Sequence, residues 1–389
     1  MRVASAFVLT ASLIALSGCN KAEPVAVAPP KPKAPARISD ADITKYKPDE
    51  SGAVMVVMYH RMKAGEADND LNRRPQTFRR DLETMLARGY YPVNAVDLVE
   101  NKMDVPIGKT PIVLTFDDAL PSQMRLVTGR DGAPHIDPDC AAGIMETFHK
   151  AHPNDWPLRA TFFVLPKEGK GTDPFGQAES VNDKFAYLTK SGYEIANHTS
   201  THSNMRGMTP DKVRWELGTA LSDIKQIAPD AQMKTFALPY GKLPRSDAAR
   251  QALLSGAQGN SSYKHEAVFL AAWRPVLSPV TKADKKLAQG GTFCLFDTTR
   301  LERVKPDPRQ AKLPGTLEYW MKYFQANKSQ RYISDGNMKF VSVPAARKSA
   351  IDQARIKAQG KTLQVYGAGG ANDSGANDSG KSGGSLSVE

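Results

Sequence analysis

Short apolar runs alternate with amphipathic stretches along the middle of this 389-residue chain. The runs have the length and residue types of buried β-strands, and the stretches between them repeat apolar residues at helical spacing. The expected strands are Ala53–Tyr59, Ile112–Phe116, Ala160–Val164, Tyr193–Ala196, Thr235–Leu238 and Val268–Ala272, and the expected helices are Gln76–Arg88, Cys140–His152 and Pro210–Ile227. This alternation predicts an α/β fold, in which a parallel sheet or barrel is covered by helices.

Both ends of the chain lack this pattern. Residues 1–18 have one early Arg, a short apolar run and small residues, which is typical of a secretory signal. Residues 19–50 are rich in Pro and Ala and predict a spacer. Residues 346–389 predict an extension that ends in a disordered tail, because their last part is rich in Gly, Ser, Asn and Asp. One domain is therefore expected over residues 51–345.

The sequence Leu16-Ser17-Gly18-Cys19 resembles a bacterial lipobox, whose cysteine is lipidated and becomes the new N-terminus. The alternative is an ordinary cleaved signal followed by an incidental cysteine. Several acyl chains on Cys19 would anchor the protein firmly in a membrane. Asn20 in the next position is typical of sorting to the outer membrane. We therefore expect a lipid-anchored protein at the periplasmic face of the envelope.

The cysteine content and the net charge narrow the class of protein further. Three cysteines exclude a disulfide-dense scaffold, and Cys140 and Cys294 either form one disulfide or are two buried thiols. The formal net charge of +11 indicates anionic surroundings. Because the chain carries an export signal, we expect these to be lipid headgroups or envelope polymers and no nucleic acid.

Chemically active side chains follow three of the expected strands. Asp117 and Asp118 end one strand, His198 and His202 follow another, and Pro239–Gly241 forms a turn after a third. Adjacent carboxylates repel each other unless a cation neutralises them, although a solvated turn is the alternative for this pair alone. Histidine and carboxylate are good ligands for Zn²⁺ and similar ions. Since the carboxyl ends of parallel strands share one edge, these groups are expected to meet there.

The same segments carry a family resemblance. The motifs are Thr115–Asp118, His198–His202 and Pro239–Gly241, with a weaker match at Val57–Arg61. Their order and spacing resemble those of the polysaccharide deacetylases, the carbohydrate esterase family four with the NodB-type homology domain. The resemblance covers about residues 53–280.

This resemblance implies a distorted (β/α) barrel in a single domain and metal-dependent removal of acetyl groups from amino sugars. Asp118, His198 and His202 would hold a divalent metal, with zinc expected and cobalt, nickel or iron as alternatives. Asp117 would act as general base, and the backbone N–H of Tyr240 would help to hold the oxyanion. The chemistry is consistent, since a bound cation activates water and polarises the acetyl carbonyl.

The chain departs from the family pattern at two places. Many members have an Arg two residues before the Pro of the third motif, where this chain has Ala237. Arg274 is a candidate to orient Asp117 instead, and a structural ion pair is the alternative role. Pro239 and Trp273 are further candidates for substrate binding.

The second departure concerns the general acid. Many members carry a late Leu-x-x-His, which is absent from residues 280–335. The proton for the leaving amine would then come from His265, from Asp117 after it has acted as base, or from water.

These features predict hydrolysis of N-acetyl groups in a GlcNAc-containing polysaccharide, either an exopolysaccharide or peptidoglycan, by a monomeric enzyme. One alternative is an O-acetyl esterase, which would use the same metal chemistry. The other is a non-catalytic lipoprotein that binds polysaccharide with a degenerate deacetylase site.

Overall fold

The computed structural model of the protein describes residues 37–166, 173–282 and 292–367. Their strands are β1 (Ala53–Tyr59), β2 (Tyr90–Val93), β3 (Thr110–Asp117), β4 (Leu126–Thr128), β5 (Pro134–Ile136), β6 (Thr161–Val164), β7 (Glu194–Asn197), β8 (Thr235–Ala237), β9 (Ser255–Gln258), β10 (Ser261–Lys264), β11 (Ala267–Phe269), β12 (Val276–Leu277), β13 (Phe340–Pro344) and β14 (Thr362–Tyr366). The α-helices are α1 (Asp40–Tyr46), α2 (Pro75–Ala87), α3 (Ala95–Val99), α4 (Ala141–Ala151), α5 (Val181–Ser191), α6 (Pro210–Ile227), α7 (Asp247–Leu254), α9 (Leu317–Ala326) and α10 (Gln353–Ala358).

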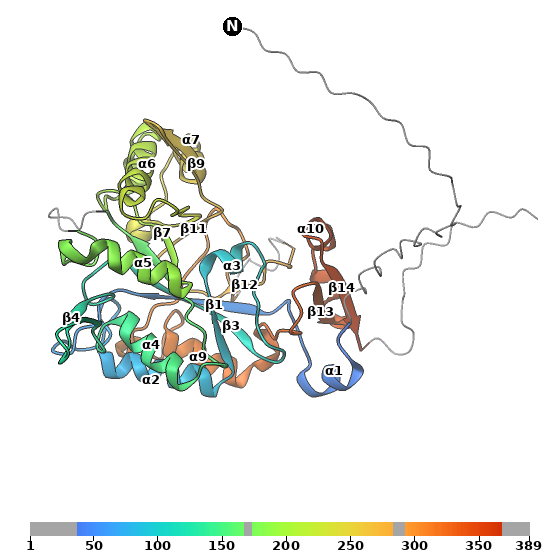
Figure 1. The fold of residues 1–389 in the computed structure, drawn as a ribbon. Coiled ribbons are helices and arrows are strands. Elements are labelled where there is room, and N and C mark those ends of the chain that lie inside the picture. The colour runs from blue at the N-terminus through green and yellow to red at the C-terminus, as the bar shows by residue number, and fades with distance from the viewer. Residues whose placement is uncertain (1–36, 167–172, 283–291, 368–389) are drawn as a thin grey trace, which may run out of the picture. The chain divides into compact units, whose positions relative to one another are not determined.

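An eight-stranded sheet forms the centre of the fold, with helices around it (Figure 1). Its strand order is β11-β8-β7-β6-β3-β1-β12, and β2 also pairs with β3. Every pairing is parallel except that of β1 with β12. The α/β prediction is therefore confirmed, and all six predicted strands are present with small shifts of their ends.

The segment from Leu301 to Val304 joins the two sides of this sheet. Leu301 pairs in parallel with Phe269 of β11, and Val304 pairs in parallel with Val57 of β1. Two backbone hydrogen bonds, Val304 N–H to Val56 O at 2.7 Å and Met58 N–H to Val304 O at 2.8 Å, hold the second contact. The sheet thus curls into a distorted barrel, with this segment filling the gap between β11 and β1.

Aromatic rings fill the space between the sheet and its helices. Phe116 of β3 stacks on Phe162 of β6 with ring centroids 5.0 Å apart, and on Tyr59 of β1 at 5.6 Å. Phe78 of α2 meets both Tyr59 and Phe116 edge to face. Burial of side chains of this size stabilises a fold by about 1.5–3 kcal/mol each.

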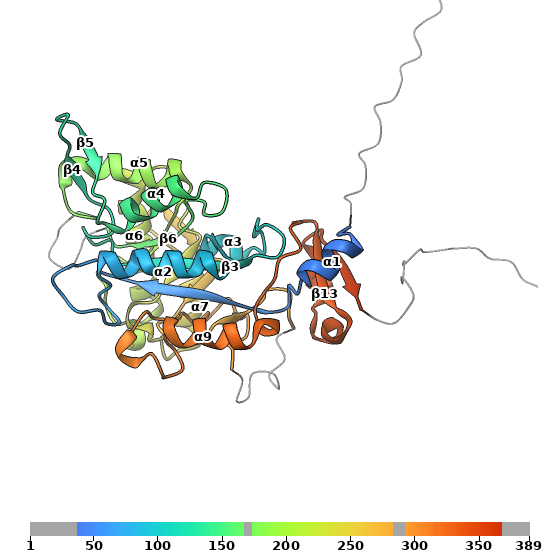
Figure 2. The ribbon, with the colours of Figure 1, turned by 90° about the horizontal axis from the view of Figure 1, so that it is seen from below.

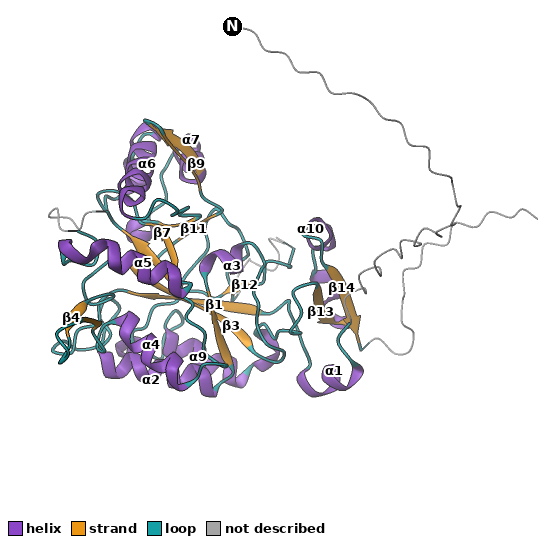
Figure 3. Cartoon of the chain, in the orientation of Figure 1, coloured by secondary structure: helices purple, strands orange, loops and turns teal. Residues whose placement is uncertain are grey.

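The predicted helices are also present, because their apolar residues recur on the side that faces the sheet. The apolar residues that α2 buries are Pro75, Phe78, Leu82 and Met85, which repeat at three- and four-residue intervals. Helix α6 begins and ends at the predicted residues, with Thr209 capping its first turn. Helices lie outside the strands in both directions of view (Figures 2 and 3).

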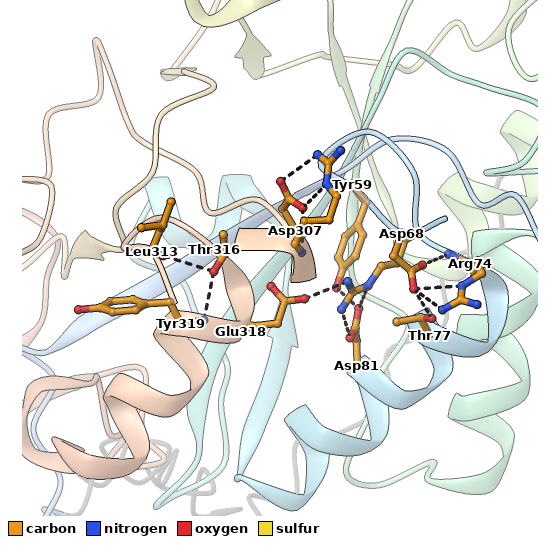
Figure 4. Close-up of polar contacts among 12 residues, drawn as sticks. Tyr59, Asp68, Arg74, Thr77, Asp81, Asp307, Leu313, Thr316, Glu318 and Tyr319 are labelled. Carbon is orange, nitrogen blue, oxygen red and sulfur yellow. Dashed lines mark hydrogen bonds and ion pairs between the residues drawn. The ribbon is translucent and has the colours of Figure 1, made fainter. Parts of the chain in front are cut away.

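An ion pair network joins α2 to α9. The guanidinium of Arg73 contacts Asp81 of α2 at 2.6 Å and Glu318 of α9 at 2.9 Å. Tyr59 donates its hydroxyl to the same Asp81 at 3.0 Å, and Figure 4 shows the side chain of Tyr59 pointing toward Asp81. Because Arg73 is almost fully buried, removal of one partner would leave an uncompensated charge.

Two short elements lie outside the predicted domain of residues 51–345. Residues 40–46 form helix α1 within the expected spacer, and β14 lies within the expected C-terminal extension. Strand β14 pairs in parallel with β13, and the hydroxyl of Tyr366 donates to the carbonyl of Pro48 at 2.9 Å. Strands β13 and β14 contribute to a small apolar cluster that also includes Val280, which is far away in sequence, so local composition did not reveal this part of the fold.

Other predictions concern the ends and the cysteines. The signal, Cys19 and residues 20–36 lie outside the described residues, as do residues 368–389. Cys140 and Cys294 are both buried and both free, which resolves the alternative in favour of two thiols. Among the described helices, none has the length and apolar character needed to span a membrane.

Candidate metal and catalytic site

The turn after β3 holds the two adjacent carboxylates. All eight residues of β3 are buried, and Asp117 is the last of them. Asp118 and Ala119 then adopt the left-handed backbone conformation, with φ of 82° and 52°. The side-chain amide of the buried Gln123 donates to the backbone carbonyl of Asp117, and to that of His60 at 2.9 Å. These two hydrogen bonds fix the turn. The carboxylates of Asp117 and Asp118 therefore contact different side chains, which are described below.

Two histidines from the loop after β7 face Asp118. Nε2 of His198 and Nε2 of His202 each lie 3.3 Å from Oδ1 of Asp118. Nδ1 of His198 lies 2.8 Å from the carbonyl oxygen of Ala237. Since a carbonyl only accepts, Nδ1 must carry the proton, and in neutral His198 the lone pair of Nε2 faces the carboxylate.

This arrangement fits a divalent cation. Oδ1 of Asp118 is buried and accepts no hydrogen bond, and ligand atoms of Asp118, His198 and His202 lie within 4.8 Å of one another. Without a cation, acceptor atoms would face each other. Burial by itself would raise the pKa of Asp118, but His198, with smaller effects from His60 and His202, outweighs it and the pKa is lowered. One carboxylate and two imidazoles are a donor set that suits Zn²⁺ and leaves positions open.

A different cation holds Asp117. The guanidinium of Arg303 donates to Oδ1 of Asp117 at 2.6 Å and to Oδ2 at 2.7 Å, and to the hydroxyl of Thr115 at 3.1 Å. Both Arg303 and Asp117 are buried. Burial alone would raise the pKa of Asp117, but Arg303, with His198, more than reverses this and lowers it. Asp117 is therefore a fixed, ionised carboxylate beside the metal site.

Arg303 corrects the expectation for Arg274. Arg274 lies after β11 as expected, but its guanidinium pairs with Glu302 at 2.5 Å. The orienting charge comes from Arg303, which lies in the segment that closes the barrel. Ala237, at the position of the missing motif arginine, is a signal for a displaced charge, but no strand pattern marks residues 301–304.

The third motif forms a tight turn beside the histidines. Tyr240 has φ of 58°, and the turn is closed by a 2.9 Å bond from Gly241 N–H to Leu238 O, which leaves the N–H of Tyr240 unused in the closure. A Cβ on Gly241 would lie 2.7 Å from the backbone nitrogen of Ala271, so only glycine fits. The ring of Tyr240 is 4.9 Å from that of His202, centroid to centroid. Pro239 is buried at the start of the turn.

Two further histidines, His60 and His265, lie in different surroundings. Nε2 of His60 lies 3.9 Å from Oδ2 of Asp117, so His60 lines the site. His265, in contrast, is buried, stacks on the rings of Phe236 and Tyr263, and shares Nδ1 with the carbonyl of Leu253 at 2.7 Å. Burial lowers its pKa to about 4. His265 is a core residue, so of the three candidate proton donors Asp117 and water remain.

Trp273 presents an exposed indole near this end of the barrel. About half of its surface is accessible, and Nζ of Lys305 lies 4.2 Å from the ring centroid. The indole N–H of Trp320 donates to the backbone carbonyl of Trp273 at 2.9 Å. The side chain is thus held by its backbone while the ring remains accessible, which suits contact with a sugar ring.

Comparison with known proteins shows a family match over part of the chain. Residues 104–255 match the family model described as polysaccharide deacetylase. A chitooligosaccharide deacetylase from Bradyrhizobium sp. (strain ANU 289) is 28% identical over 134 residues, which cover 34% of this chain and 48% of that protein. The match thus spans about half the length of that curated relative.

Two solved structures of other proteins have low sequence identity and low TM-scores with this chain. The deacetylase PplD of Streptococcus pyogenes, in complex with acetate, is 16% identical with a TM-score of 0.45, covering 66% of this chain and 93% of that one. IcaB from Ammonifex degensii is 16% identical with a TM-score of 0.43, covering 70% and 97%. The family model and the curated relative carry the similarity: residues 104–255 of this chain match the polysaccharide deacetylase family.

Proposed function

We propose that this protein is a metal-dependent hydrolase that removes N-acetyl groups from a GlcNAc-containing polysaccharide of the cell envelope. One observation carries the proposal. Asp118, His198 and His202 bring their ligand atoms close enough together to bind one cation, and the carboxylate of Asp117, held by Arg303, lies directly beside them. A site that only binds sugar has no need of a fixed second carboxylate next to a metal ligand.

Each residue has a separate task. Asp118, His198 and His202 would hold the cation, which when bound lowers the pKa of water and polarises an acyl oxygen. Asp117, kept ionised by Arg303, accepts the proton from the attacking water. The N–H of Tyr240, which the turn leaves unused, would donate to developing negative charge on the acyl oxygen. His60, whose Nε2 lies 3.9 Å from Oδ2 of Asp117, is the side chain that we propose returns a proton to the leaving amine.

The proposed setting follows from the sequence. The export signal and the lipobox-like ending at Cys19 support a lipid-anchored protein at the periplasmic face of an outer membrane. The positive net charge supports a location among anionic lipids and polymers. Exopolysaccharide and peptidoglycan are both within reach of such a protein.

Acetate release tests the proposal. Wild type and Asp117→Asn are incubated with GlcNAc oligomers, peptidoglycan fragments and an O-acetylated glycan, after chelation and again after zinc is restored. We expect zinc-dependent release from an N-acetylated substrate by wild type, and a loss of at least about 100-fold in Asp117→Asn. Release from the O-acetylated glycan alone would favour an esterase. No release from any of these glycans would favour a polysaccharide-binding protein.

A further inference from the structure

The loop that carries both metal-site histidines has an unfavourable backbone. Thr199 and His202 have φ of 71° and 54°, in the left-handed region that residues with a side chain rarely adopt. His198 and His202 nevertheless face the same oxygen of Asp118. Something outside the loop must therefore hold it in this conformation.

The buried carboxylate of Glu216, on α6, contacts this loop at three points. Its Oε2 accepts hydrogen bonds from the backbone N–H groups of Ser200 at 3.2 Å and Thr201 at 3.0 Å. Its Oε1 accepts the hydroxyl of Thr201 at 2.6 Å. The side chain of Glu216 has no accessible surface. All three donors lie between the two histidines in sequence.

The next residue of α6 holds the start of the same loop. The side-chain amide of Asn197 donates to the carbonyl of Leu217 at 3.1 Å, and its oxygen accepts the N–H of Thr199 at 2.8 Å. The hydroxyl of Thr199 in turn accepts the N–H of His202 at 3.0 Å. Consecutive residues of one helix thus fix the loop before His198 and between the histidines.

The position of Glu216 in the helix is unusual. The buried face of α6 includes Val213, Leu217, Ala220 and Ile224, at intervals of three and four residues. Glu216 lies three residues after Val213 on that apolar face. A carboxylate is costly to bury and is retained where its hydrogen bonds are needed.

We propose that Glu216 is a positioning residue of the metal site, which sets the geometry of His198 and His202 through the backbone between them. This inference deepens the proposed function and rests on it only in requiring that the site bind a divalent metal. An ionised carboxylate accepts all three bonds, whereas an alanine accepts none and a glutamine keeps one acceptor oxygen.

The strand that leads to the two histidines, β7, carries a matched control residue. Glu194, at the start of β7, also accepts three hydrogen bonds: from Val96 N–H at 2.9 Å, from Thr161 at 2.7 Å and from Thr235 at 2.5 Å. It lies at the opposite end of the strand from the histidines. Loss of Glu194 therefore removes comparable bonds without touching the metal-site loop.

The test measures zinc affinity by competition with a chromogenic chelator, in wild type, Glu216→Ala, Glu216→Gln and Glu194→Ala. We expect zinc affinity to fall about 10–100-fold in Glu216→Ala, less in Glu216→Gln, and not in Glu194→Ala. The visible absorption spectrum of the cobalt-loaded protein should change in Glu216→Ala and not in Glu194→Ala.

Two results would overturn the inference while the proposed function stands: wild-type zinc affinity in folded Glu216→Ala, or an equal loss in Glu194→Ala. If Glu216→Ala does not fold, unaltered zinc affinity and cobalt spectrum in Glu216→Gln would overturn it. Absence of zinc binding by wild type would overturn the proposed function itself.

Discussion

At the scale of single residues, the buried guanidinium of Arg303 determines the state of the candidate base. It makes two short contacts with Asp117 and also donates to the carbonyl of Leu270 at 3.0 Å. The four side chains Asp117, Asp118, His198 and His202 could be predicted because each follows a recognisable strand. Arg303 could not, since its role depends on a pairing between residues far apart in sequence.

Arg303→Lys tests this role without removing the positive charge. A lysine offers one compact ammonium in place of the planar two-pronged contact, so the carboxylate of Asp117 loses its fixed orientation. We expect kcat for acetate release to fall about 100-fold, which is the scale of loss when a reacting group moves by about 1 Å. Zinc affinity should remain as in wild type, because Arg303 contacts no proposed ligand.

Arg274→Lys is the control for this change, since Arg274 pairs with Glu302 instead of Asp117. Its kcat should stay near that of wild type. A similar loss of kcat in both variants would contradict the assignment of Arg303 as the orienting residue.

At the scale of elements, the sequence predicted six strands of the central sheet, and it missed several short strands, including ones that form only through distant pairing. β1 and β3 are buried throughout and rich in apolar residues, so both were predictable. The closing segment includes Glu302 and Arg303, and β12 has only two residues, so neither has a local pattern. The same holds for β14, which exists because β13 provides a partner.

The C-terminal strand pair leads to a prediction about chain length. Truncation after residue 345 removes α10 and β14, and with them Ile351 and Ile356 from the apolar cluster that includes Val341 and Val343. We expect the free energy of unfolding to fall by on the order of 3 kcal/mol, from the lost burial of these side chains. Urea denaturation of both proteins measures the difference.

Truncation after residue 367 is the matched control, because it retains β14 and removes only the Gly/Ser/Asn-rich end. Its stability should equal that of the full chain. Equal stability of the shorter truncated protein would show that β14 contributes nothing to the fold.

At the scale of the whole molecule, the site joins segments that only the complete sheet brings together. Asp118 follows β3, the histidines follow β7, and β6 lies between these strands in the sheet. Arg303 comes from the segment that closes the barrel on the other side. In the unfolded chain these groups are far apart, so a metal ion would bind the native state much more tightly than the unfolded one.

Zinc should therefore stabilise the folded body as well as support catalysis. A ligand that binds only the native state raises the free energy of unfolding by about 2.7 kcal/mol when its free concentration is 100 times its Kd. Urea denaturation with zinc and with a chelator measures this increment. His202→Ala should lose most of this zinc-dependent stabilisation, because one of the three proposed ligands is gone. Asp117→Asn should keep the stabilisation, because Asp117 is the proposed base and not a metal ligand. An increment in His202→Ala as large as in wild type would mean that zinc stabilises the protein from another site.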